Sequence, residues 1–256
     1  MNMRIATVQQ MRETDRIAIQ ERGIPSTGLM ERAAAALADE VMNLTGDCVG
    51  RVVCFCGPGN NGGDGVACAR QLLEAGFEVR CVLVGSHEKM TQDTRAMEAK
   101  LAAAGGKLEP FQPDDAEFAA WCLEANVMVD ALFGIGLNSD IRGDALTAVH
   151  MMNTCDIPVV SADIPSGVET DTGRVLGEAV RAARTVTFTL PKAGHYVGKG
   201  GLCTGALTVA DIGIPKDLVD ALDCPVSTVE AAGVKLPRRP LDAHKGDFGR
   251  CAILGG

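Results

Sequence analysis

Apolar positions follow a helical spacing at the N-terminus. Thr7 and Gln10 match a capping box, which predicts a first helix that ends near Gly23 and Pro25. Over residues 26–45, apolar side chains again recur three and four positions apart, which predicts a second helix. Two helices therefore precede the first predicted strand.

From residue 52 onward, short apolar runs alternate with helical patterns. The predicted strands are 52–56, 78–84, 127–132, 158–163, 185–189 and 206–210, and the predicted helices are 63–75, 91–104, 116–123 and 145–153. Repeated strand–helix–strand order with apolar strands indicates a mostly parallel sheet covered on both faces. We therefore predict an α/β fold, a Rossmann-like three-layer sandwich preceded by two helices. In such folds, ligands bind at the carboxyl ends of the strands.

Composition narrows the classes of partner. The 256 residues carry a net charge of −9, which argues against the broad basic surface that nucleic-acid binding requires. No apolar run approaches the ~18 residues of a membrane span, and no secretory signal pattern is visible, so we expect a cytoplasmic protein without a membrane partner. Ten cysteines occur without a C-x-x-C pair. Several of them, Cys54, Cys56, Cys68 and Cys81, lie in apolar strand or helix patterns, so we expect small buried hydrophobic side chains and not zinc ligands or disulfides.

A glycine-rich segment, residues 57–65, lies between the first predicted strand of the sheet and the next helix. Glycines there let the backbone approach a phosphate, and a helix N-terminus favours its negative charge. The alternative is a tight turn without a ligand. No carboxylate ends the following strand, which argues against a nicotinamide-dependent oxidoreductase, and no Gly-Lys-Ser/Thr follows, which argues against a P-loop.

Residues 58–65 resemble the signature loop of the NAD(P)H-hydrate epimerases, the YjeF N-terminal domain. Five other segments also resemble this family, and together the matches cover about residues 5–220: 29–33, 130–137, 163–167, 191–194 and 211–215. The resemblance implies an isomerase that interconverts the R and S forms of hydrated NADH and NADPH, and it implies a homodimer.

The resemblance also predicts a domain boundary. Residues 1–234 would form the epimerase domain. The prolines and arginines of 235–240 are typical of a linker. The tail from residue 245 resembles the start of an ADP-dependent hydrate dehydratase domain, so we expect 235–256 to be a linker and the truncated beginning of that domain. The whole protein would then be a bifunctional repair enzyme.

By the same resemblance, two loops and one strand end hold the hydrated dinucleotide. The implied substrate-binding residues are Asn60, Asn61, Gly62, Gly63, Asp64, Gly134, Ile135, Gly136, Leu137, Asn138, Ser139, Asp140 and Asp163. Asn61, Asp130 and Ser166 would ligate a potassium ion. Oxygen donors of this kind suit a hard cation.

We hypothesise that Asp163 is the general acid and base of the reaction. Epimerisation at a hydroxyl-bearing ring carbon beside nitrogen can proceed by loss of water to an iminium ion and readdition from the other face. Any rise in the pKa of Asp163 would come from its burial in a closed site. Lys192 and His195 lie in a glycine-containing loop that could cover the site, although solvated side chains are the more common outcome.

Simpler interpretations exist for each of these residues. Asp130 and Asp163 could cap helices or form turns, and Ser166 could be a turn residue. The alternative for the whole chain is a non-catalytic nucleotide-binding or scaffold module. Loss of the acidic residues would mark such a module, whereas Asp64, Asp130 and Asp163 are all present.

Overall fold

The structure is a computed structural model that describes residues 3–46, 48–229, 242, 244 and 252. The predicted linker and dehydratase start, 235–256, lie outside these residues except for three isolated positions. The helices and strands of the described segments all lie between residues 4 and 227.

Seven strands form one sheet in the order β4-β3-β2-β5-β6-β7-β8. Their bounds are β2 Arg51–Cys56, β3 Glu78–Leu83, β4 Leu108–Pro110, β5 Val127–Ala131, β6 Val159–Ala162, β7 Arg184–Phe188 and β8 Ala206–Ala210. Every neighbouring pair in this sheet is parallel, so the predicted Rossmann-like α/β fold is confirmed. The chain leaves β2 first toward β3 and β4 and later returns to β5 on the other side. A ligand cavity is expected at this reversal of strand order.

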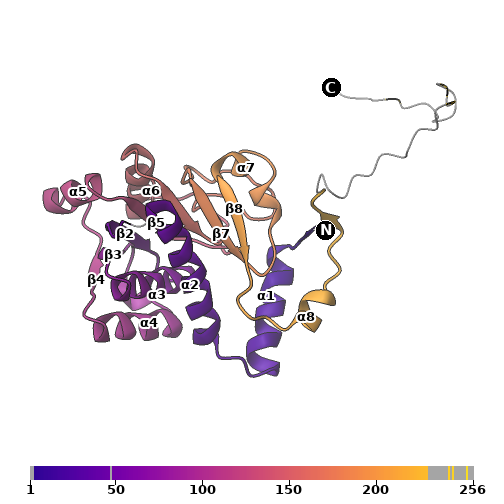
Figure 1. The fold of residues 1–256 in the computed structure, drawn as a ribbon, viewed down its shortest axis with the longest axis horizontal. Coiled ribbons are helices and arrows are strands. Elements are labelled where there is room, and N and C mark those ends of the chain that lie inside the picture. The colour runs from indigo at the N-terminus through magenta and orange to yellow at the C-terminus, as the bar shows by residue number, and fades with distance from the viewer. Residues whose placement is uncertain (1–2, 47, 230–241, 243, 245–251, 253–256) are drawn as a thin grey trace.

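Helices cover both faces of the sheet (Figure 1). On one face, Val52, Cys54 and Cys56 of β2 pack with α2 (Ser26–Thr45), α3 (Asn60–Glu74) and α4 (Gln92–Ala103). On the other face, Val53 and Phe55 pack with α5 (Ala116–Leu123) and α6 (Asp144–Thr154). Because successive strand side chains point to opposite faces, one apolar run supplies both cores. None of the helices in the described part of the chain is long and apolar enough to span a membrane.

The first predicted helix forms and is capped as expected. Thr7 accepts a hydrogen bond from the Gln10 backbone, and the Gln10 side chain reaches back to the Thr7 backbone. The helix α1 (Val8–Arg16) continues as a π-helical turn over Ile17–Glu21, which the sequence pattern does not predict. Further short elements are η2 His87–Lys89, η3 Ala193–His195, α7 Gly200–Cys203 and α8 Lys216–Asp220.

The prediction missed three short strands. The edge strand β4 has three residues, and β1 (Arg4–Ile5) pairs with β9 (Val226–Ser227) in a separate antiparallel pair. Two or three residues are too few to show an alternating pattern, so only the tertiary pairing reveals them. The β1–β9 pair contradicts the prediction that no strand precedes the two helices.

Cysteines contribute apolar bulk to the core. Cys54, Cys56, Cys68 and Cys81 are at most 2% exposed, and the cysteines that the structure describes are free thiols. Burial raises the pKa of Cys56 well above its ordinary value, and the neighbouring Cys81 adds to the rise. These thiols therefore behave as the predicted small hydrophobic residues.

Candidate functional site

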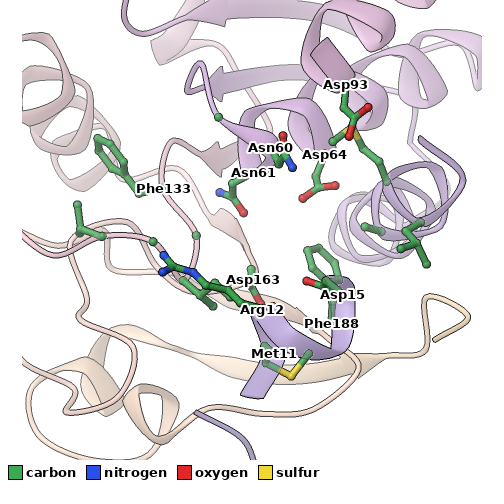
Figure 2. A pocket seen from close by; sticks show the side chains of 18 of the residues that line it. Met11, Arg12, Asp15, Asn60, Asn61, Asp64, Asp93, Phe133, Asp163 and Phe188 are labelled. Atoms are coloured by element: carbon green, nitrogen blue, oxygen red, sulfur yellow. The ribbon is translucent and has the colours of Figure 1, made fainter. Parts of the chain in front are cut away.

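A cavity of about 680 Å³ lies at the carboxyl ends of the central strands. Its walls come from α1, α2, the N-terminus of α3, the loop after β5 and the ends of β6 and β7 (Figure 2). Ten residues of the predicted set line it: Asn60, Asn61, Asp64, Gly134, Ile135, Gly136, Leu137, Asn138, Ser139 and Asp163. The cavity coincides with the reversal of strand order, as this class of sheet leads us to expect.

The glycine-rich segment becomes the first turn of α3. The helix begins at Asn60, three residues earlier than predicted, with Gly59 in an extended conformation as its N-cap. Gly62 and Gly63 are buried beneath the cavity, and a Cβ on Gly62 would overlap the carbonyl oxygen of Gly57. The first backbone N–H groups of a helix have no intrahelical acceptor, so this end of α3 suits an anion.

Asp163 directly follows β6 and carries an unusual backbone. Its φ of 62° lies in the left-handed region, which costs about 1–3 kcal/mol for a residue other than glycine. Lys192 Nζ donates to Asp163 Oδ1 at 2.6 Å, and Thr187 Oγ1 donates to the same oxygen at 2.9 Å. Burial works to raise the pKa of Asp163, but the charge and hydrogen bond of Lys192 outweigh it and hold the pKa below its ordinary value. Burial alone therefore does not set the pKa of Asp163, because Lys192 reverses its effect.

Lys192 and His195 belong to the site and are not solvated. Lys192 is 1% exposed and His195 3% exposed. The backbone N–H of Lys192 donates to His195 Nδ1 at 3.0 Å, so Nε2 carries the proton and donates to the carbonyl oxygen of Asp163 at 2.8 Å. Burial and the charge of Lys192 lower the pKa of His195 to about 4, which keeps the ring neutral. The glycines of this loop suggested a mobile surface, whereas the contacts with Asp163 bury both side chains.

Asp130 and Ser166 form a buried polar cluster behind the cavity. Ser166 donates to the Asp130 carboxylate from Oγ at 2.6 Å and from its backbone N–H at 2.8 Å, and Ser161 Oγ donates at 2.8 Å. Burial raises the pKa of Asp130, although these hydrogen bonds oppose the rise. No Lys, Arg or His in the described segments forms an ion pair with Asp130. Among the described residues, Asp130 is thus a buried carboxylate that accepts hydrogen bonds from serine hydroxyl and backbone N–H groups and has no positively charged side chain as a partner.

The loop after β5 lies between Asn61 and this cluster and contacts both. Ser166 Oγ accepts a hydrogen bond from Phe133 N at 3.0 Å. At the next residue, a Cβ on Gly134 would lie 3.0 Å from Asn61 Oδ1. The three residues implied as potassium ligands therefore gather around Phe133 and Gly134. Asp140, by contrast, is exposed and does not line the cavity.

Helix α1 supplies cavity residues that the sequence analysis missed. Met11, Arg12 and Asp15 of α1 line the cavity, together with Ile19 in the π-helical turn that follows. Met11, Asp15 and Ile19 are four positions apart, so the helical spacing was a signal for one shared face. Burial raises the pKa of Asp15 to about 6; Lys192 acts against this and Asp163 adds to it.

Asp64, on α3, is a further carboxyl group with a raised pKa. It is half-buried and lines the cavity (Figure 2). Burial, with smaller contributions from Asp163 and Asp15, raises its pKa well above the ordinary value. The cavity therefore holds carboxyl groups shifted in opposite directions, which is typical of acid–base sites.

The strand order, the glycine-capped helix and the carboxylate-lined cavity at the strand ends define a Rossmann-like α/β protein with a candidate site at its topological switch point. Residues 26–194 match the sequence family described as YjeF-related protein N-terminus. The chain belongs to this family.

Proteins similar to this chain include both long and short relatives. The bifunctional NAD(P)H-hydrate repair enzyme Nnr of Moorella thermoacetica is 38% identical, and the match covers 99% of this chain and 49% of that protein. An NAD(P)H-hydrate epimerase of Limosilactobacillus reuteri is also 38% identical, over 82% of this chain and 96% of that protein. The chain spans about half the length of the bifunctional relatives it matches.

A solved structure supports the same fold. The crystal structure of yeast ynu0, YNL200c, superposes with a TM-score of 0.72 at 24% identity and covers 84% of this chain and 92% of that one. At this identity the likeness concerns the fold.

Proposed function

We propose that this chain interconverts the R and S forms of hydrated NADH and NADPH. The observation that carries the proposal is the Lys192-paired carboxylate of Asp163, which faces the N-terminus of α3 across one cavity (Figure 2). The helix end suits the phosphates of a dinucleotide, and in this proposal the reactive ring lies beside the carboxylate of Asp163. The names of the similar proteins, NAD(P)H-hydrate epimerase and NAD(P)H-hydrate repair enzyme, support this choice of substrate.

The reaction requires two proton transfers. The hydroxyl group leaves the ring carbon as water after gaining a proton, while the lone pair of the ring nitrogen forms the C=N bond of an iminium ion. Water then adds to the other face, forms the new C–O bond and loses a proton. Asp163, kept ionised by Lys192, is suited to accept that proton.

The proton donor is a different carboxyl group in this proposal. An ionised Asp163 has no proton to give, whereas Asp64 and Asp15 retain theirs to higher pH than ordinary aspartates. Both line the same cavity as Asp163. In the reverse epimerisation the donor and acceptor exchange roles. The proposal thus assigns the proton acceptor and the proton donor to different carboxyl groups, in place of the hypothesis that Asp163 does both.

A potassium ion fits the cluster of Asn61, Asp130 and Ser166. The buried carboxylate of Asp130 accepts only neutral hydrogen bonds among the described residues, and a monovalent cation would balance its charge. The ion would supply fixed positive charge beneath the N-terminus of α3. Asn61 would then be held in position for the substrate.

The decisive experiment combines a racemic hydrate with a stereospecific dehydratase. If this chain is an epimerase, its addition leads to consumption of both epimers, whereas the dehydratase alone stops after one. An Asp163→Asn variant should slow the epimerisation about 10²–10⁴-fold. Unchanged activity of this variant, with its fold intact, would refute the role of Asp163, and a wild-type chain without effect would favour the scaffold alternative.

Three wider expectations stay predictions. A dehydratase domain after residue 256 would make the whole protein bifunctional, as in the longer relatives' names. The homodimer can be checked by light scattering of the purified protein. Fractionation of cells would check the cytoplasmic location.

A further inference from the structure

More acidic than basic side chains line the cavity. Its six ionisable side chains are Arg12, Asp15, Asp64, Asp93, Asp163 and Lys192. Lys192 is buried and bonded to Asp163, so its charge is already balanced. A ligand with phosphate groups entering this cavity meets three further carboxyl groups and needs a cation that is not already paired.

Arg12 lines the cavity and has no charged partner among the described residues, so it can be that cation. It is exposed on α1, and the structure gives its guanidinium no ion pair or hydrogen bond with any described residue. Its Nη2 lies 3.4 Å from the place that a Cβ on Gly136 would occupy, so the guanidinium rests against the loop after β5. Figure 2 shows Arg12 across the cavity from Asn60 and Asn61, which begin α3.

We propose that Arg12 binds a phosphate group of the substrate from the side opposite the α3 N-terminus. The inference rests on the proposed function for the identity of the substrate, a phosphate-bearing dinucleotide. A planar guanidinium offers two parallel donors to one phosphate, and helix N–H groups can hold the other oxygens. The absent side chain of Gly136 leaves the room that this approach needs. Arg12 thus contributes to affinity, and the chemical steps belong to the carboxyl groups.

The test compares Arg12→Ala with Arg16→Ala, one helical turn further along α1. Arg16 is exposed and pairs with Glu13 and Glu21, so it controls for charge and helix content away from the cavity. Binding of ADP-ribose, which has the pyrophosphate but no nicotinamide, is measured by calorimetry at two salt concentrations. Epimerisation kinetics are measured with the hydrates of NADH and NADPH separately.

A charge-assisted hydrogen bond to phosphate leads us to expect that Arg12→Ala weakens ADP-ribose binding and raises KM about 10-fold or more. The salt dependence of binding should also decrease. Arg12→Lys should recover part of the affinity, and Arg16→Ala should behave as the wild type. A rise in KM for both hydrates identifies the pyrophosphate as the bound group, and a rise for the NADPH hydrate alone identifies its additional phosphate.

Two results overturn the inference. One is equal ADP-ribose affinity and KM in Arg12→Ala and Arg16→Ala, and the other is a wild-type chain that does not bind ADP-ribose. A wild-type chain that binds ADP-ribose through Arg12 but does not accelerate epimerisation refutes the proposed function and supports the phosphate contact.

Discussion

Replacement of Lys192 by methionine isolates the electrostatics of the site. Lys192 Nζ donates to Asp163 Oδ1, to Thr187 Oγ1 at 2.7 Å and to the Phe188 carbonyl oxygen at 3.2 Å. Methionine keeps most of the buried apolar stem but removes the charge. Asp163, which is 7% exposed, would then have to remain ionised without its cation or take up a proton.

The size of the effect depends on pH. Because the folded-state pKa of Asp163 lies below its ordinary value, the ion pair stabilises the fold above about pH 4 and loses this contribution as the pH falls through the folded-state pKa. In the variant, protonation limits the penalty. A carboxyl group with an unfolded-state pKa near 3.9 costs about 4 kcal/mol to protonate at pH 7 and about 1.5 kcal/mol at pH 5. We therefore expect a loss of about 3–4 kcal/mol at pH 7 that falls to about 1–2 kcal/mol at pH 5.

Urea unfolding at pH 5 and pH 7 measures both values. Lys199→Met is the matched control because Lys199 lies in the same loop and is exposed. The double variant Lys192→Met with Asp163→Asn removes the titrating carboxyl group, so the pH dependence of its deficit should disappear. A loss below about 1 kcal/mol at pH 7, or an equal loss at both pH values, would contradict the assignment of a stabilising buried pair.

Three further predictions concern the loop, the second carboxyl group and the cation. Gly62→Ala should lower the free energy of unfolding in urea by about 1–3 kcal/mol or more, because the new Cβ overlaps Gly57. Gly59→Ala is the control: its Cβ has open space, so the loss should be less than about 1 kcal/mol. Similar losses in the two variants would show that the close approach of Gly62 to Gly57 is not required. Asp15→Asn should stabilise the fold by about 2–3 kcal/mol at pH 8, because burial raises the folded-state pKa of Asp15 to about 6 and the ionised form is penalised above it. The same variant should have little effect on stability at pH 4, and a pH-independent effect would contradict this reasoning. Potassium chloride should give the wild type a higher thermal unfolding midpoint than the same concentration of tetramethylammonium chloride. The midpoint of Asp130→Asn should be the same in both salts. Equal midpoints of the wild type in both salts would exclude the potassium site.

Local patterns were sufficient for most of the fold. Each central strand is an apolar run and each helix has its own periodic face, so their order implied a parallel sheet and a cavity at the strand ends. The capping box of Thr7 and Gln10 is a contact within one helical turn, so it could be predicted from the sequence. The strands β1, β4 and β9 depend on partners far along the chain, and their two or three residues have no pattern of their own.

The candidate site also has features that could be predicted from the sequence and features that only the tertiary structure decides. The pattern of strands and helices located the glycine-rich loop, the family resemblance implied Asn60, Asn61 and Asp163, and the structure brings all three to one cavity. The protonation of the site was decided only by tertiary structure, because the charge that controls Asp163 comes from Lys192, 29 residues further along the chain. Ion pairing and burial change a pKa through contacts in space, and the order of residues does not specify which distant charged side chain makes that contact.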